Sequence, residues 1–332
     1  MQVPIIDISP FLEPASPGNA AARAEVASQW SAAFSTIGFA SVVGHGVERE
    51  LFRAVQQASK VFFDSPMKKK QQSSFAGEKQ SQGYYQVGVE TVNKAFAKAD
   101  GKAPPPDLVE TLTFAFVDWE MDGTRSDFER SIFRANLWPD APDNLGELVR
   151  DYYARVRYIA RVLMEISAQA LELPAGFFAP YYERIATSLR LAHYPEQVVE
   201  PEPGQLRYGA HTDYMGYTIL LQDDAPGGLQ VLDSDGSWID APPRAGAFTV
   251  NCGDLLSRWT NGRWKSNIHR VVNPPRSVTG SSRRISVVMF TGPDYEAEIT
   301  CIPTCRSEAY PARHAPIRCW EHFQNKVRAS LD

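Results

Sequence analysis

The sequence of 332 residues predicts an α+β fold, in which a mostly helical first half precedes a β-rich second half. Apolar residues recur at steps of three and four from Leu145 to Leu173, which is the period of an amphipathic α-helix. From Leu189 onward, short apolar segments alternate with turn signals such as Ser234-Asp235-Gly236. Many short strands at regular spacing are typical of a β-barrel or β-sandwich, so the second half is expected to form the core of one compact unit.

The first half contains several further elements. Val3–Ile8 is short and apolar and predicts an opening strand. Ala20–Ile37 has helical spacing and stops at Gly38, a favourable residue for the C-terminal cap of a helix. The other elements expected here are a strand at Phe39–Val43, a helix at Glu48–Phe63 and an exposed loop at Lys94–Pro106.

The second half is expected to contain eight short strands and a closing helix. The strands are Leu189–Tyr194, Tyr217–Leu221, Gly228–Leu232, Trp238–Ile239, Ala247–Val250, Arg270–Val272, Ile285–Phe290 and Ala297–Ile302, and the helix covers about Ile317–Ala329. Residues 1–332 therefore divide into a helical region (1–175), a β core (185–305) and a C-terminal helix (306–332).

Composition and charge exclude several classes of partner. The net charge is −5, whereas a surface that binds nucleic acid needs an excess of Lys and Arg. No apolar stretch reaches the roughly 20 residues that span a membrane, and the opening MQVPIIDISPF does not resemble a signal peptide. Reduced thiols are expected, because only two of the four cysteines, Cys301 and Cys305, lie close together. The sequence thus predicts a cytoplasmic protein with neither nucleic acid nor membrane as its partner.

A His-x-Asp pair in the β-rich half is a candidate metal site. Residues two apart on an extended chain project to one face, so His211 and Asp213 can hold one ion. His269 supplies a second imidazole, and two His with one carboxylate form the facial triad of non-haem Fe(II) oxygenases. Taken alone, the pair would more often be a surface or turn-capping pair. For the other four histidines, packing or solvent exposure is the better interpretation.

A second pair with this spacing is a candidate anion site. Arg284 and Ser286 are two apart in a predicted strand and therefore share a face. A guanidinium offers a planar fork of donors and a hydroxyl adds one more, which suits a carboxylate. The alternative is an arginine exposed on an edge strand.

These motifs, in this order, resemble the isopenicillin N synthase-like superfamily. This is the group of 2-oxoglutarate- and Fe(II)-dependent dioxygenases, whose core is a jelly roll or double-stranded β-helix. The residues that carry the resemblance are Tyr208-Gly209-Ala210-His211-Thr212-Asp213, Gly228-Leu229-Gln230-Val231, Asn251-Cys252-Gly253-Asp254, Asn261 to Ser266, His269-Arg270-Val271 and Arg284-Ile285-Ser286. Upstream, Pro4-Ile5-Ile6-Asp7, Gly44-His45-Gly46-Val47 and Gly83-Tyr84-Tyr85 extend it over most of the chain.

The resemblance implies a role for each candidate residue. His211, Asp213 and His269 would bind Fe(II), while Arg284, Ser286 and Tyr194 would hold the distal carboxylate of 2-oxoglutarate. Phe290, Phe114 and Tyr85 would lie near the substrate, with core packing or an exposed loop as the alternative. The chain departs from the plant pattern Asn-Tyr-Tyr-Pro, because it reads Ala192-His193-Tyr194-Pro195. One polar contact to the cosubstrate is therefore in doubt.

The implied activity is O₂-dependent oxidation of a small organic molecule in specialised metabolism, with release of succinate and CO₂. Hydroxylation, desaturation and ring closure all remain open. An oxidase of the isopenicillin N synthase type would use the same iron ligands without 2-oxoglutarate. A non-catalytic jelly-roll binding protein and a zinc hydrolase are the alternatives of other classes.

Overall fold

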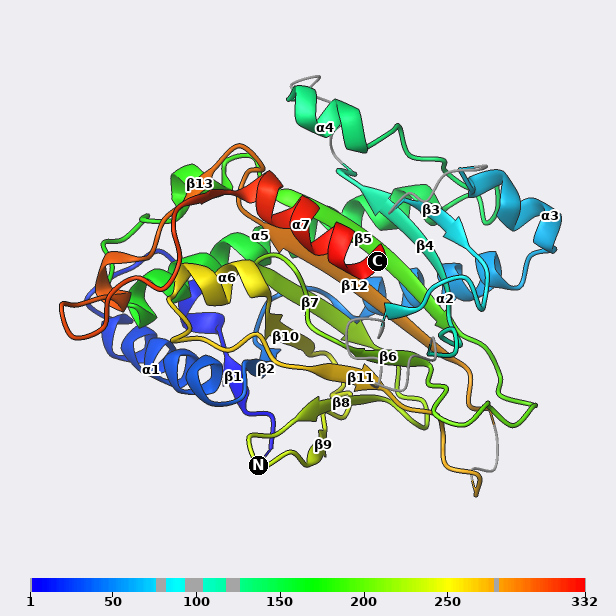
Figure 1. Cartoon of the computed structure of the whole chain (residues 1–332). Helices are drawn as coiled ribbons and strands as arrows, with labels where there is room; N and C mark the ends of the chain where they lie inside the picture. Colours follow the sequence, from blue (N-terminus) through cyan, green and yellow to red (C-terminus); the bar gives the residue numbers. More distant parts are fainter. Residues whose placement is uncertain (1, 76–81, 93–103, 118–125, 278–280, 332) are drawn as a thin grey trace.

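A computed structural model of the chain describes residues 2–75, 82–92, 104–117, 126–277 and 281–331 (Figure 1). Most of the loop expected at Lys94–Pro106 lies outside these residues. The helices are α1 (Ala20–Thr36), α2 (Arg49–Phe63), α3 (Met67–Lys70), α4 (Asp127–Ile132), α5 (Leu145–Ala170), α6 (Asp254–Trp259) and α7 (Cys319–Leu331).

The described strands form two main sheets. The strands are β1 (Ile5–Asp7), β2 (Phe39–Val43), β3 (Gly83–Tyr85), β4 (Glu110–Ala115), β5 (Ala186–Tyr194), β6 (Tyr208–His211), β7 (Tyr217–Gln222), β8 (Leu229–Leu232), β9 (Trp238–Asp240), β10 (Phe248–Cys252), β11 (His269–Val271), β12 (Arg284–Gly292), β13 (Glu298–Ile299) and β14 (Ile317–Arg318). The large sheet has the order β1-β2-β10-β7-β12-β5-β4-β3, and the small sheet has the order β6-β11-β8-β9. Two facing sheets with these crossovers are the jelly-roll core.

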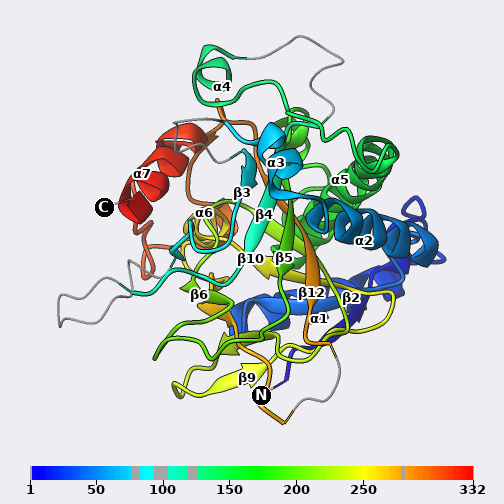
Figure 2. The same cartoon turned by 90° about the vertical axis from the view of Figure 1, so that its right-hand side faces the viewer.

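Helices cover one face of the large sheet. In Figure 2, α2 and α5 lie on one side of that sheet, whereas β6 and α7 lie on the other. The helix α5 buries a continuous apolar stripe that includes Val149, Val156 and Leu163, as its three- and four-residue spacing predicts. In α1, the indole of Trp30 donates a hydrogen bond of 2.9 Å to the hydroxyl of Tyr217 on β7. The helices thus pack on one face of the large sheet, and the small sheet lies on its other face.

Most predicted elements are confirmed within a few residues, and three differences have clear reasons. The strand expected at Ala297–Ile302 is only Glu298–Ile299, because it pairs solely with Ile317–Arg318 outside the two main sheets. Because Ile317 and Arg318 form this strand, the closing helix begins at Cys319 and not at Ile317 as expected. Strand β4 was not predicted, because Glu110 in ETLTFA reads as solvent-facing although the whole strand is buried.

None of the described helices is both long enough and apolar enough to cross a membrane. All four cysteines are free thiols, and Cys252, Cys305 and Cys319 are buried. The expectation of reduced, mostly buried thiols agrees with this arrangement.

Candidate functional site

The structure brings His211, Asp213 and His269 together between the two sheets. His211 ends β6 and His269 begins β11, and the two residues are direct partners in the antiparallel register. Asp213 follows β6 in the loop to β7. One ligand atom from each of the three residues lies within 4.8 Å of the others. The His211 and His269 Nε2 atoms are 3.7 and 3.8 Å from the two oxygens of Asp213.

Backbone carbonyls orient both imidazoles. Nδ1 of His211 lies 2.9 Å from the carbonyl oxygen of Gly209, and Nδ1 of His269 lies 3.0 Å from that of Asn267. A carbonyl can only accept, so each Nδ1 carries the proton and each Nε2 presents a lone pair to the centre. Burial, together with the neighbouring His269 ring, lowers the pKa of His211 to about 4. The imidazole of His211 is therefore neutral near pH 7, the form that binds a metal.

Only one oxygen of the Asp213 carboxylate accepts hydrogen bonds from the described residues. Its Oδ2 accepts hydrogen bonds of 2.6 Å from Thr218 Oγ1 and from Asn251 Nδ2. No hydrogen bond to Oδ1 is present among the described residues, which leaves that atom for a metal. Two imidazoles and one carboxylate on one face match an Fe(II) site with open positions, so the donor set fits iron.

Arg284 and Ser286 lie across the cavity from the metal ligands, on β12 of the large sheet. Arg284 is 1% exposed, yet its guanidinium has only neutral hydrogen-bond partners among the described residues. It donates to the carbonyl of Ala225 at 3.0 Å and to Gln222 Oε1 at 2.7 Å. Burial lowers the pKa of Arg284, although a guanidinium stays charged in proteins. A buried cation without an ion pair is suited to an incoming anion.

Tyr194 on β5 is the register partner of Arg284 and is also buried. Burial raises the pKa of Tyr194 to about 12, so its phenol stays protonated and can donate a hydrogen bond. Together with Ser286, it lines a narrow cavity that also includes the three metal-ligand candidates. The structure therefore places all six candidates for metal and cosubstrate around one space.

A larger cavity of about 370 Å³ adjoins this space and includes His211 and Asp213 in its wall. Phe290 and Tyr85, the residues for which the resemblance implies a place near the substrate, both line the larger cavity. Phe114 does not line it: its ring is stacked on Trp138, with the centroids 4.4 Å apart. The C-terminal helix α7 contributes Phe323 and Val327 to the wall.

Three polar residues of this wall were not predicted from the sequence: Arg190, Glu90 and Tyr208. A signal for Arg190 was available, because it lies an even number of residues before Tyr194 on β5 and so shares its face. Tyr208 lies in the motif with His211, and its ring meets that imidazole edge-on at 4.9 Å. No pattern in the sequence marked Glu90.

Two of the other histidines serve packing or internal hydrogen bonds. His45 is packed against Phe248, with the ring centroids 4.5 Å apart. His193 lies on the helix-covered face of the large sheet, where Nδ1 is 2.7 Å from Glu110 Oε1 and Nε2 accepts from Arg283. Neither lines the two cavities described above.

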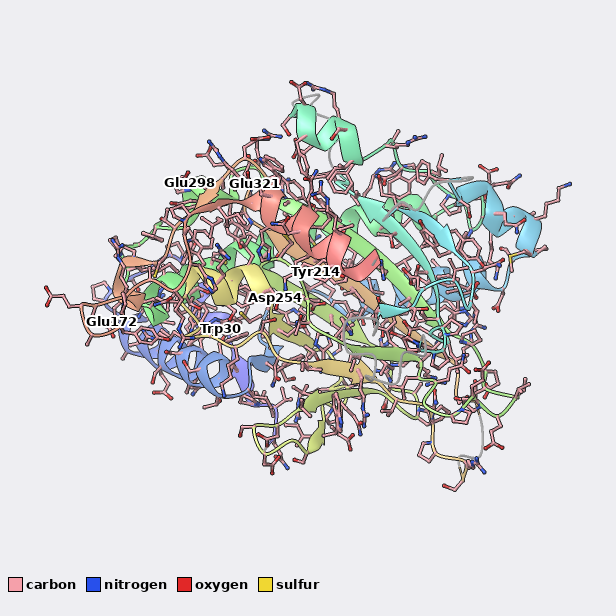
Figure 3. The ribbon with its side chains drawn as sticks, in the orientation of Figure 1. Trp30, Glu172, Tyr214, Asp254, Glu298 and Glu321 are labelled. Atoms are coloured by element: carbon pink, nitrogen blue, oxygen red, sulfur yellow. The ribbon has the colours of Figure 1, made fainter. Side chains whose placement is uncertain are left out.

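His322 of α7 donates through Nε2 to the carbonyl of Tyr214 at 2.9 Å. Tyr214 directly follows Asp213, so this bond ties the C-terminal helix to the loop of the metal-ligand candidates. Figure 3 labels Tyr214 and Asp254 close to α6 and α7.

Comparisons with known proteins agree with this geometry. The sequence profile of the 2OG-Fe(II) oxygenase superfamily matches residues 186–293, and that of the non-haem dioxygenase in morphine synthesis N-terminal region matches residues 3–141. A 2-oxoglutarate-Fe(II) type oxidoreductase from Aspergillus fumigatus is 33% identical, over 99% of this chain and 93% of the relative. Homoarginine-6-hydroxylase from Oryza sativa is 31% identical, over 98% and 96%.

A solved structure is similar over the whole fold. A full-length protein of Neurospora crassa, crystallised with alpha-KG and thymine, has a TM-score of 0.82 and 28% identity, covering 98% of this chain and 96% of its own. The chain belongs to the 2OG-Fe(II) oxygenase superfamily and is a 2-oxoglutarate-dependent dioxygenase with iron as its metal.

Proposed function

We propose that His211, Asp213 and His269 bind the Fe(II) of this dioxygenase and that Arg284, Ser286 and Tyr194 bind 2-oxoglutarate. The observation that carries the proposal is the approach of three ligand atoms to within 4.8 Å of one another. The buried guanidinium of Arg284, which has no ion pair among the described residues, supports the assignment of the cosubstrate carboxylate.

Bound iron would supply the redox chemistry, in which O₂ and 2-oxoglutarate are converted with the substrate to an oxidised product, succinate and CO₂. The chain itself orients the participants. Gly209 and Asn267 hold the imidazoles through their carbonyls, and Thr218 and Asn251 hold Asp213. Such outer hydrogen bonds fix the orientation of ligands before a metal binds.

The substrate we propose is a small organic molecule of specialised metabolism that occupies the cavity of about 370 Å³. Small compounds appear in the names of the relatives: homoarginine for the Oryza sativa hydroxylase and thymine for the complex of the Neurospora crassa protein. Phe290 and Tyr85 would contact this substrate, because both line the cavity. Free thiols and an acidic net charge support a cytoplasmic protein with no nucleic-acid partner.

Three alternatives receive less support. An oxidase that works without 2-oxoglutarate, a non-catalytic binding protein and a zinc hydrolase could each retain part of the site. The relatives are named as a 2-oxoglutarate-Fe(II) type oxidoreductase and a 2-oxoglutarate-dependent dioxygenase, which favours the dioxygenase over all three.

The test is anaerobic titration of the protein with Fe(II) and then with 2-oxoglutarate, followed by a screen for succinate release over candidate small molecules. We expect one iron per chain in the wild type and a large loss of iron affinity in His269→Ala. Iron binding of equal affinity in both proteins would contradict the ligand assignment.

A further inference from the structure

The wall of the larger cavity contains an ion pair whose two members are nearly enclosed. Arg190 on β5 places Nη1 at 3.4 Å from Oε1 of Glu90, and the two side chains are 17% and 18% exposed. Both residues line the cavity that includes His211 and Asp213. An ion pair at this position faces whatever occupies the cavity next to the metal-ligand candidates.

The pair retains unused hydrogen-bonding capacity. Arg190 donates through Nε to Thr113 Oγ1 at 3.2 Å and through Nη1 to the hydroxyl of Tyr208 at 3.0 Å. Its Nη2 has no hydrogen-bond partner among the described residues. Glu90 accepts one long bond, of 3.4 Å, from Thr111 Oγ1. A free donor and a weakly used acceptor therefore lie side by side.

The pair is fixed close to the metal-ligand candidates. Tyr208, which accepts from Arg190, contacts the ring of His211 on the same strand. Phe290 also lies near the guanidinium, with its ring centroid 5.9 Å from Cζ of Arg190. A group bound by the pair would be held at a fixed distance from the site of oxidation, which is what a substrate-orienting contact requires.

The opposite charges of Arg190 and Glu90 limit which kind of chemical group can bind to the pair. The positive and negative charges of Arg190 and Glu90 offset each other, so a ligand with a single charge would pair with one and be repelled by the other. A zwitterion could pair with both but would lose the hydration of two charges, which is costly. The remainder of the wall is rich in aromatic side chains, including Phe133, Tyr295 and Phe323. Burying further charge beside such a surface is unfavourable, whereas a flat apolar ring is accommodated.

We propose that Arg190 and Glu90 together determine substrate specificity by binding a neutral, planar molecule that carries a carbonyl next to an N–H, as in an amide, lactam or imide. The carbonyl accepts from Nη2 of Arg190, and the N–H donates to an oxygen of Glu90. This inference rests on the proposed function, because it assumes that the cavity of about 370 Å³ receives the substrate.

The test uses four probes that share one benzene ring: benzamide, benzoate, toluene and L-phenylglycine. Each is titrated calorimetrically into anaerobic protein loaded with Fe(II) and 2-oxoglutarate. We expect benzamide to bind wild type at least about tenfold more tightly than the other three, because a hydrogen bond to a charged group contributes roughly that factor.

Two variants make the prediction specific. Glu90→Gln removes the negative charge that repels benzoate, so benzoate should bind more tightly while benzamide binds more weakly. Arg190→Gln should weaken benzamide by about tenfold and leave benzoate weak. Arg155→Gln is the matched control, because its ion pair with Asp151 is on the exposed surface of α5, and none of the four affinities should change.

The outcomes separate this inference from the proposed function. Equal or tighter binding of benzoate, toluene or L-phenylglycine by wild type would overturn it, as would the absence of measurable benzamide binding. Equal changes for all four probes in Glu90→Gln would also overturn it. If wild type bound Fe(II) but not 2-oxoglutarate in the first titration, the proposed function itself would fail.

Discussion

Arg283 and Arg284 are neighbours in the chain but lie on opposite faces of the large sheet, and of the two only Arg283 has an ion pair among the described residues. Arg283 faces the helices and has an ion pair, with Nη1 2.8 Å from Asp64 Oδ1. It also donates through Nε to His193 at 2.8 Å. Arg284 faces the cavity, is almost fully buried and has no ion pair among the described residues.

The difference suggests which cations of this fold are structural and which can bind an anionic ligand; the paired Arg190 is proposed to bind a neutral group instead. On the helix-covered face the charges are matched internally: Lys70 lies 2.8 Å from Glu110, which also accepts from Tyr84 and contacts His193. On the cavity face the guanidinium of Arg284 donates hydrogen bonds only to neutral groups among the described residues. Leaving a buried charge unpaired is unfavourable, so such a residue is a strong candidate for binding an anion from solution.

The largest effect is expected from removing a carboxylate on the cavity face. Asp213→Ala takes away one of three iron ligands, and 2-oxoglutarate turnover should fall by about a thousandfold or more. Asp64→Ala is the matched change on the other face, where the carboxylate is 61% exposed, and turnover should stay within about twofold. Succinate release at saturating Fe(II) measures both. Comparable losses in the two variants would remove the distinction between the faces.

The next largest effect separates the two arginines directly. Arg284→Met should raise the dissociation constant for 2-oxoglutarate by about ten- to a hundredfold, because a charge-assisted pair is lost. Arg283→Met should leave that constant within about twofold. The rise in melting temperature that 2-oxoglutarate induces should follow the same pattern, nearly absent in the first variant and retained in the second. A loss of 2-oxoglutarate affinity in Arg283→Met would break the comparison.

The sequence predicted those residues of the cavity face whose positions follow from regular strand geometry. Arg284 and Ser286 are two residues apart on β12, and alternation along this strand was enough to place them on one face. The same spacing predicted that His211 and Asp213 converge, which they do although Asp213 lies in the loop after β6. Prediction failed where a residue's environment comes from distant segments. The resemblance placed Phe114 near the substrate, but Phe114 lies on the face of β4 opposite to Thr113, which lines the cavity, and stacks on Trp138.

The ionic network on the helix-covered face was also missed, for a related reason. Glu110 reads as a solvent-facing residue, and its burial depends on Lys70 and His193 from other elements. Arg190 could have been recognised from its even spacing to Tyr194, whereas Glu90 has no local pattern and joins the cavity only through the folded chain.

A moderate loss of stability is expected at acidic pH, because His193 on the helix-covered face becomes protonated. His193 is buried, and this burial lowers its pKa below the ordinary 6.5, although Glu110 acts in the opposite direction. The unfolded chain therefore binds the proton more readily. The contribution of neutral His193 to the free energy of unfolding is fully present above pH 6.5 and is lost as the pH falls below that value. His193→Gln should lower the melting temperature by a few degrees at pH 7.5 and flatten its fall below pH 6.5. An unchanged pH profile of the melting temperature in this variant would exclude His193 as the source.

The smallest effect tests whether location or charge pairing decides the role of a cation. Lys326 of α7 lies beside the metal-ligand loop, and like Arg283 it has a counter-ion: Nζ lies 2.5 Å from Asp254 Oδ2, which also accepts from Thr212. If pairing decides, Lys326→Met should leave 2-oxoglutarate affinity within about twofold and lower the melting temperature only slightly, because partly exposed ion pairs contribute little. Calorimetric titration of 2-oxoglutarate and thermal unfolding measure the two effects. A tenfold loss of affinity would mean that position beside the metal-ligand loop, rather than an unpaired charge, marks the cations that bind 2-oxoglutarate.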